Sequence, residues 1–425
     1  MIGFHMQSPV PDWPQAAALL PAGTWVKAVS DQGICREYKR YNPGLKVVFR
    51  YEYNDRQHLT GDYHELARKY FRAFIDGTFW ANRHYLYIDA IEEWNEYLAN
   101  SQSTAERAEW VKWCRAVNEV WTAEYRIQPE LAHIRLVSCN TAIGNDIHPD
   151  FARIVQQHDG ILAYHNYTVV RKGVIPEAED WQYYSGRWTA MDAVYRAQGI
   201  TVDWLFTEGG ACTIGEVDGV LYSPHVAANA LGTEVNTLFG RATQSVNPNT
   251  WYSGVTEGWK HKANYNGNLT AYIQGAIKYQ IDRTAAWNKV NGGRALGHTL
   301  FTTANSPGVW DKFQLGTAEW RQIAQFVRDY APAPEPPPID PPPPPSGDPV
   351  AEILTFARSI TDANNDSALQ LAMWRDGWDI AGPERWTTID GVQYAVKPAV
   401  KQGNPHIRAY YCRVPEWNNI KVVEG

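Results

Sequence analysis

The segment Trp204-Leu-Phe-Thr-Glu-Gly-Gly-Ala211 points to the architecture of the whole chain. It begins within Val202 to Phe206, a short apolar run with a β-branched and aromatic bias, typical of a strand buried on both faces. The run stops at Thr207-Glu208, and two glycines follow. In an α/β barrel the carboxyl ends of the strands open onto the active-site face. Glu208 is therefore a candidate for chemistry.

A second segment has the same form, because Tyr87 to Ile91 leads into Glu92-Glu93-Trp94-Asn95-Glu96. Glu96 lies 112 residues before Glu208, a gap that holds about three βα units. The two glutamates would then end strands four and seven. A single such glutamate is more often a solvated strand-end acid, but two in this order favour a shared site. Asp89, Glu92 and Glu93 are rival carboxylates if strand four has other bounds.

Residues 1 to about 330 alternate short apolar runs with amphipathic helices, which predicts βα units around a parallel sheet. The expected strands are Ile2–Met6, Trp25–Val29, Leu45–Phe49, Tyr87–Ile91, Ile134–Ser138, Ile161–Tyr164, Val202–Phe206 and Ala295–Phe301. Thr104 to Tyr125 is the clearest helix, since Trp110, Cys114, Val117 and Trp121 form one stripe. The fold class is therefore α/β, and we expect a (β/α)8 TIM barrel over residues 1–330.

Two further regions follow the barrel. Residues 331–349 contain Pro336-Pro337-Pro338 and an unbroken run from Pro341 to Pro345, which predicts a semi-rigid polyproline linker. Residues 350–425 predict a small α+β accessory domain, with strands at 394–396, 407–414 and 420–423 and helices near 351–359 and 367–375. This domain is a candidate for binding a cell wall or glycan surface; a simple folding appendage is an equal alternative.

Composition narrows the class of protein. The 425 residues carry a formal net charge of −7, and they contain neither a basic cluster for nucleic acid nor an apolar run long enough for a membrane span. Aromatic residues make up 13% of the chain. Their rings suit carbohydrate partners, because a sugar face of C–H groups packs on an aromatic ring. Most of these rings nevertheless fill the core in an ordinary protein.

The five cysteines show no CxxC pairing, so the sequence indicates neither a zinc site nor a disulfide framework. We expect buried thiols, with Cys139 and Cys212 close in space. Strand one has no His-x-His pair for a metal, and the chain has no Gly-x-Gly-x-x-Gly or Walker loop for a nucleotide. We therefore expect no metal and no cofactor.

Three short motifs resemble the retaining glycoside hydrolases of the large (β/α)8-barrel clan A: Trp94-Asn95-Glu96, His165-Asn166-Tyr167 and Phe206-Thr207-Glu208-Gly209. The resemblance implies that Glu96 is the acid/base and Glu208 the nucleophile. It also implies that Asn95 donates to the sugar 2-hydroxyl. Two facing carboxyl groups are the minimum apparatus for such hydrolysis.

The same resemblance assigns substrate-binding residues. It implies that Tyr167 donates to the nucleophile, that His165 lies near the sugar, and that Trp310 floors the catalytic subsite. By their positions alone, Arg50 and His5, at the ends of strands three and one, would reach the same face, although both could equally be structural.

The sequence thus predicts a retaining glycosidase that cleaves a β-linked polysaccharide or oligosaccharide. Two alternatives stay open: a phage or bacterial lysin of cell-wall glycan, and a non-catalytic glycan-binding barrel protein. The chain opens directly in strand-like sequence, Ile2 to Met6, without a signal peptide. We expect an extracellular or phage-associated protein whose signal was removed or whose release needs cell lysis.

Overall fold

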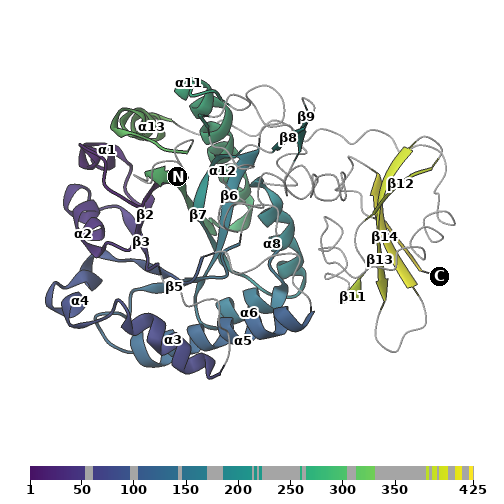
Figure 1. Ribbon diagram of the computed structural model, residues 1–425, viewed down its shortest axis with the longest axis horizontal. Helices are drawn as coiled ribbons and strands as arrows, with labels where there is room; N and C mark the ends of the chain where they lie inside the picture. Colours follow the sequence, from purple (N-terminus) through teal and green to yellow (C-terminus); the bar gives the residue numbers. More distant parts are fainter. Residues whose placement is uncertain are drawn as a thin grey trace, which may run out of the picture.

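Eight parallel strands close into a barrel in the computed structural model (Figure 1). The described residues are 1–52, 61–95, 104–141, 146–169, 185–212, 215–217, 220–222, 259–260, 265–303, 313–330, 380–381, 385–389, 392–400, 407–413 and 421–424. The barrel strands are β1 (Ile2–Met6), β2 (Trp25–Val29), β3 (Lys46–Arg50), β4 (Ala90–Glu92), β5 (Arg135–Ser138), β6 (Ile161–Val169), β7 (Asp203–Cys212) and β10 (Ala295–Thr303). Each strand pairs with the next, and β10 closes the ring against β1.

The predicted strands agree with the structure in number and order. The bounds of β1 and β2 are as predicted. The prediction for strand four was wrong at its start, because His84–Tyr87 forms a 3₁₀ helix and β4 begins only at Ala90. Glu92 therefore belongs to the strand itself. The strands β6 and β7 extend beyond the apolar runs that predicted them, since polar residues continue the pairing.

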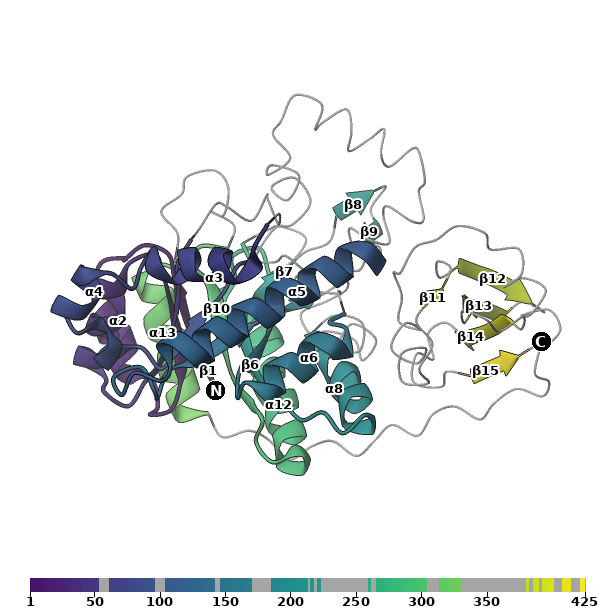
Figure 2. The same ribbon diagram turned by 90° about the horizontal axis from the view of Figure 1, so that it is seen from below.

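Helices surround the ring of strands (Figures 1 and 2). They are α1 (Trp13–Leu19), α2 (Gln32–Tyr41), α3 (Tyr63–Arg72), α4 (Gly77–Ala81), α5 (Thr104–Val120), α6 (Pro149–Gln157), α8 (Arg187–Ala197), α11 (Leu269–Tyr272), α12 (Lys278–Asn291) and α13 (Thr317–Asp329). Two π-helical turns, Trp121–Tyr125 and Ile273–Ile277, continue α5 and join α11 to α12.

The stripe predicted for α5 is buried as expected at Cys114, Val117 and Trp121, while Trp110 is only partly covered.

None of the described helices is both long and apolar enough to cross a membrane.

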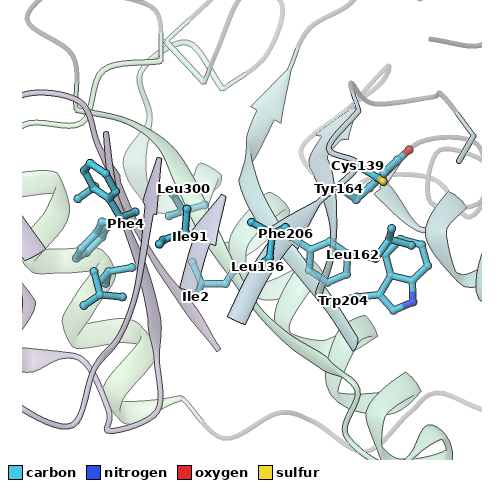
Figure 3. Close-up of a cluster of buried hydrophobic side chains, with 14 of the residues drawn as sticks. Ile2, Phe4, Ile91, Leu136, Cys139, Leu162, Tyr164, Trp204, Phe206 and Leu300 are labelled. Atoms are coloured by element: carbon cyan, nitrogen blue, oxygen red, sulfur yellow. The ribbon is translucent and has the colours of Figure 1, made fainter. Parts of the chain in front are cut away.

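Strand alternation divides the side chains into two sets. One set points outward to the helices and forms the large core, for example Phe4, Ile91 and Phe206 (Figure 3). The inward set begins with a separate apolar cluster whose barrel-strand members are Trp25, Val48, Ala90, Val137, Ile161, Ala163, Leu205 and, partly buried, Leu296. Period-2 alternation places the next inward layer two residues further along each strand.

The C-terminal part of the chain forms a separate antiparallel sheet in the described residues. Its strands are β11 (Ile380–Ala381), β12 (Arg385–Ile389), β13 (Val392–Val400), β14 (Ile407–Arg413) and β15 (Lys421–Glu424). A two-stranded hairpin, β8 (Gly215–Val217) and β9 (Val220–Tyr222), follows β7. The predicted linker and the two predicted C-terminal helices lie outside the described residues, so the domain limits stay a prediction.

Gly3 gives a test of the close packing between β1 and β2. A Cβ at this position would lie 2.0 Å from the Trp25 carbonyl oxygen, which is backbone and has little freedom to move. We expect Gly3→Ala to lower the free energy of unfolding by about 3 kcal/mol. At Gly77, the first residue of α4, a Cβ would meet nothing within 4 Å. Gly77→Ala should therefore stay within about 0.5 kcal/mol of wild type, or be slightly more stable. Urea unfolding compares the three proteins, and equal midpoints would contradict this packing.

Candidate active site

An irregularity in β7 turns Glu208 into the barrel. In the pairing with β6, Ala163 aligns with Leu205 and His165 with Glu208, so two residues along β6 correspond to three along β7. The pairing with β10 shows the same extra residue between Phe206 and Gly209. Simple alternation would point Glu208 outward, on the same face as Phe206. The β-bulge reverses this and aims the carboxylate at the barrel axis.

Two cations hold one oxygen of the Glu208 carboxylate. Arg50 Nη1 donates to Oε1 at 3.0 Å, and Lys27 Nζ lies 3.4 Å from the same atom. Arg50 ends β3, which stands opposite β7 in the ring of eight strands, so its guanidinium reaches across the barrel. All three side chains are almost fully buried. The carboxylate is thus held by contacts to the far wall as well as by its own strand.

The second oxygen of Glu208 faces neighbouring rings. The Tyr167 hydroxyl donates to Oε2 at 3.2 Å, and His165 Nδ1 lies 3.5 Å from it. His5 Nδ1 lies 3.8 Å from Oε1. Tyr167 and His165 are alternate residues of β6, and His5 is on β1. Two strands, β6 and β1, therefore supply three rings around a single carboxylate.

A second buried carboxylate, Glu92, shares the Lys27 ammonium. Lys27 Nζ lies 2.7 Å from Glu92 Oε2, closer than it lies to Glu208. The Asn140 amide donates to Glu92 Oε1 at 3.3 Å and to the Trp94 carbonyl at 2.7 Å. Lys27, Glu92 and Asn140 are all fully buried. Lys27 thus bridges Glu92 on β4 and Glu208 on β7.

The positive charges around Glu92 and Glu208 explain why both carboxylates are ionised. Burial alone would raise the pKa of Glu208, but His165, Lys27, His5 and Arg50 together lower it well below the usual value. Burial lowers the pKa of His5, and burial followed by Arg50 lowers that of Lys27. The pKa of Arg50 is raised, because Glu208 and Glu92 outweigh the effect of its burial. For Glu92, burial again raises the pKa, and Lys27 and Arg50 outweigh it, so that this pKa is lowered too. Both carboxylates are therefore ionised at neutral pH.

The other two acids near β4 face elsewhere. Asp89, before the strand, pairs with Lys39 and Lys46 at 2.7 and 2.9 Å. Glu93, after the strand, accepts from the Trp113 indole at 2.9 Å and from the Cys139 backbone N–H at 2.7 Å. Neither contact involves the Glu208 cluster. Glu92, fixed as an anion by Lys27, is poorly suited to donate a proton.

The structure brings five of the predicted site residues together: Glu208, Tyr167, His165, Arg50 and His5. Asn95 also reaches the cluster, because its side-chain oxygen accepts a hydrogen bond from Arg50 Nη1. Glu96 and Trp310 lie outside the described residues, so their placement stays a prediction. The described residues contain no group of three or more His, Cys, Asp or Glu arranged to hold a metal ion.

Sequence reasoning missed Lys27 and gave Glu92 only as a rival acid. The signal for Lys27 was present, because it is the one charged residue in the apolar strand Trp25–Val29. A lysine at the centre of a strand buried on both faces needs an anionic partner. Its partners are 65 and 181 residues away along the chain, which no local pattern reveals.

Comparison with known proteins gives a likeness of fold only. No family model matches the chain, and no curated protein matches its sequence. A GH53 catalytic domain from Ignisphaera aggregans aligns over 76% of this chain and 91% of its own, with 13% identity and a TM-score of 0.39. A GH18 chitinase from Cycas revoluta aligns over 77% and 98%, with 9% identity and a TM-score of 0.41. A β-glucosidase from Exiguobacterium marinum aligns over 75% and 86%, with 9% identity and a TM-score of 0.33. These neighbours are glycoside hydrolases, but TM-scores below 0.5 identify neither family nor activity.

Lys27 should be essential to the stability of this layer. Lys27→Met leaves Glu92 and Glu208 with one cation between them, and removing one partner of a buried ion pair costs about 3 to 5 kcal/mol. Lys46→Met is the control, because Lys46 makes a half-exposed ion pair with Asp89 and should cost at most about 1 kcal/mol. The free energy of unfolding in urea measures both effects. Equal losses in the two variants would contradict the bridging role of Lys27.

Acid should destabilise the barrel through the same carboxylates. The folded pKa values of Glu92 and Glu208 lie below their unfolded values, so their contribution to stability is present above about pH 4.3. It is lost as the pH falls through the folded values. We expect the free energy of unfolding to fall from about pH 5 to pH 3, and to fall less steeply in Glu208→Gln. A wild-type stability that is constant or rising over that range would contradict the assignment.

Proposed function

We propose that this protein is a retaining glycoside hydrolase acting on a β-linked glycan. The observation that carries the proposal is the Glu208 carboxylate, which a β-bulge turns into the barrel and which Arg50, Lys27 and Tyr167 hold in place. An ionised, oriented carboxylate at the carboxyl end of a barrel strand is the group that attacks an anomeric carbon in this reaction.

The two oxygens of Glu208 have different surroundings, which suggests which one attacks. The cations Arg50 and Lys27 both contact Oε1, whereas Oε2 accepts from the hydroxyl of Tyr167 and lies 3.5 Å from His165 Nδ1. Oε1 is therefore the oxygen that Arg50 and Lys27 hold, and Oε2 is the oxygen left to attack. In the proposed first step, Oε2 bonds to the anomeric carbon as the glycosidic C–O bond breaks, and the acid/base gives its proton to the leaving oxygen.

We assign the acid/base to Glu96, on the resemblance of Trp94-Asn95-Glu96 to clan A. Two observations support this choice over the neighbouring acids. Glu92 is held as an anion by Lys27, and Glu93 points to the Trp113 indole. Asn95, the residue before Glu96, reaches Arg50 beside Glu208. In the second step Glu96 would take a proton from water, which attacks the anomeric carbon and releases Glu208.

The stereochemistry of the product tests the mechanism. A panel of aryl β-glycosides is incubated with the wild-type protein, and ¹H NMR follows the anomer that forms first. We expect the β anomer, because two displacements at one carbon restore its configuration. The α anomer as first product would show an inverting enzyme instead. Binding of oligosaccharides and cell-wall glycan without any cleavage over days would contradict the enzyme assignment itself.

Replacing the nucleophile provides the second test. Glu208→Ala should lower kcat with the best aryl glycoside by about 10³-fold or more, and added azide should restore turnover with an α-glycosyl azide as product. Glu65→Gln, on the exposed face of α3, is the control and should keep full activity. Circular dichroism checks that Glu208→Ala is folded, because the change also removes the partner of Arg50. A folded Glu208→Ala variant with wild-type kcat would exclude Glu208 as the nucleophile.

A further inference from the structure

Two cysteines that lie 25 residues apart along the chain meet between α5 and the end of β5. Cys114 on α5 and Cys139, directly after β5, have their Sγ atoms 3.3 Å apart, and both side chains are fully buried. The expected neighbour of Cys139 was Cys212, whose side chain lies outside the described set. We propose that Cys114 and Cys139 form a disulfide bond that ties α5 to the end of β5.

The backbone conformation of Cys139 directs its side chain towards Cys114. Val137 belongs to the inward apolar cluster, so alternation would also point Cys139 into the barrel. Cys139 instead has φ of 65°, in the left-handed region that L-residues seldom adopt, and its side chain lies against Cys114. Its backbone N–H donates to the Glu93 carboxylate at 2.7 Å, which holds this conformation. The backbone conformation of Cys139 and its hydrogen bond to Glu93 therefore hold its sulfur atom against that of Cys114.

The sulfur atom of Cys114 is positioned by Asn118, one turn further along α5. The Asn118 amide lies 3.7 Å from Cys114 Sγ and donates to the Cys114 carbonyl at 2.8 Å and to the Ser138 hydroxyl at 3.2 Å. Asn118 thus connects the helix turn that carries Cys114 to the residue before Cys139. Cys35, the other cysteine with a described buried thiol, lies on α2 and has no sulfur partner among the described residues.

Formation of the bond needs an oxidant, and a small-molecule disulfide such as oxidised glutathione supplies it. The thiolate of one cysteine attacks the donor disulfide, forms a mixed disulfide and releases one glutathione thiol. The second cysteine then loses its proton and displaces the second glutathione thiol, so two electrons pass to the donor. Because Cys114 and Cys139 are buried in the folded barrel, we expect the exchange to take place during folding.

The bond would also stabilise the candidate site indirectly. Asn140 follows Cys139 and donates to Glu92 and to the Trp94 carbonyl. A covalent link at Cys139 therefore anchors the residues that position Glu92 and the backbone before Asn95. It restricts the unfolded chain as well, since it closes the loop of residues 114–139.

Refolding under controlled redox conditions tests the proposal. Reduced, denatured protein is refolded either in a glutathione redox buffer or in excess reductant, then alkylated under denaturing conditions without reductant. Peptide mass spectrometry should find Cys114 joined to Cys139 after the first treatment, and both alkylated after the second. The oxidised form should melt several degrees higher than the reduced form. Alkylation of both residues after oxidative refolding, or a cross-link of Cys139 to Cys212, would overturn the proposal.

Variants separate this bond from other redox effects. Cys35→Ala should keep both the cross-linked peptide and the redox-dependent change in Tm, whereas Cys114→Ala should lose both. If Cys114→Ala does not fold, the peptide map of the wild-type protein still decides the question. Loss of the redox-dependent Tm change in Cys35→Ala would show that the change comes from another thiol and would overturn the stabilising role.

Discussion

The structure of the candidate site depends on the placement of two positive and two negative side chains in one layer inside the barrel. Lys27 and Arg50 face Glu92 and Glu208, and all four are removed from water. An isolated charge in such a place would be very unfavourable, so the four are stable only as a set. Each strand that carries one of them must keep its register for the others to be paired.

The barrel separates a supporting layer from this charged layer. Apolar side chains such as Trp25, Val48 and Leu205 fill the interior towards the amino ends of the strands. Lys27 and Arg50 follow two residues after Trp25 and Val48, on the same face of their strands. The apolar layer keeps water away from the charges on that side, which strengthens the attraction between them. The same two strands therefore supply both the support and the electrostatics.

Three acids near β4 illustrate how position decides the role of a side chain. Asp89 pairs with lysines before the strand, Glu92 faces the barrel interior, and Glu93 turns outward beneath α5. The three side chains have the same charge and lie within five residues of one another. Their partners differ because a strand turns successive side chains to opposite faces. One acid is thus a surface counter-ion, one a charge in the site and one a buried structural group.

The sequence by itself determined the barrel, because eight apolar runs separated by helical patterns suffice to predict parallel strands with helices between them. It also pointed to Glu208, where a buried run ends, and to His165 and Tyr167 through their resemblance to clan A. The tertiary structure decided the inward direction of Glu208, which depends on a bulge measured against both neighbouring strands. It also decided the partners of Lys27 and the meeting of Cys114 with Cys139. These contacts join residues far apart in the chain, and strand pairing and helix packing, rather than local composition, bring them together.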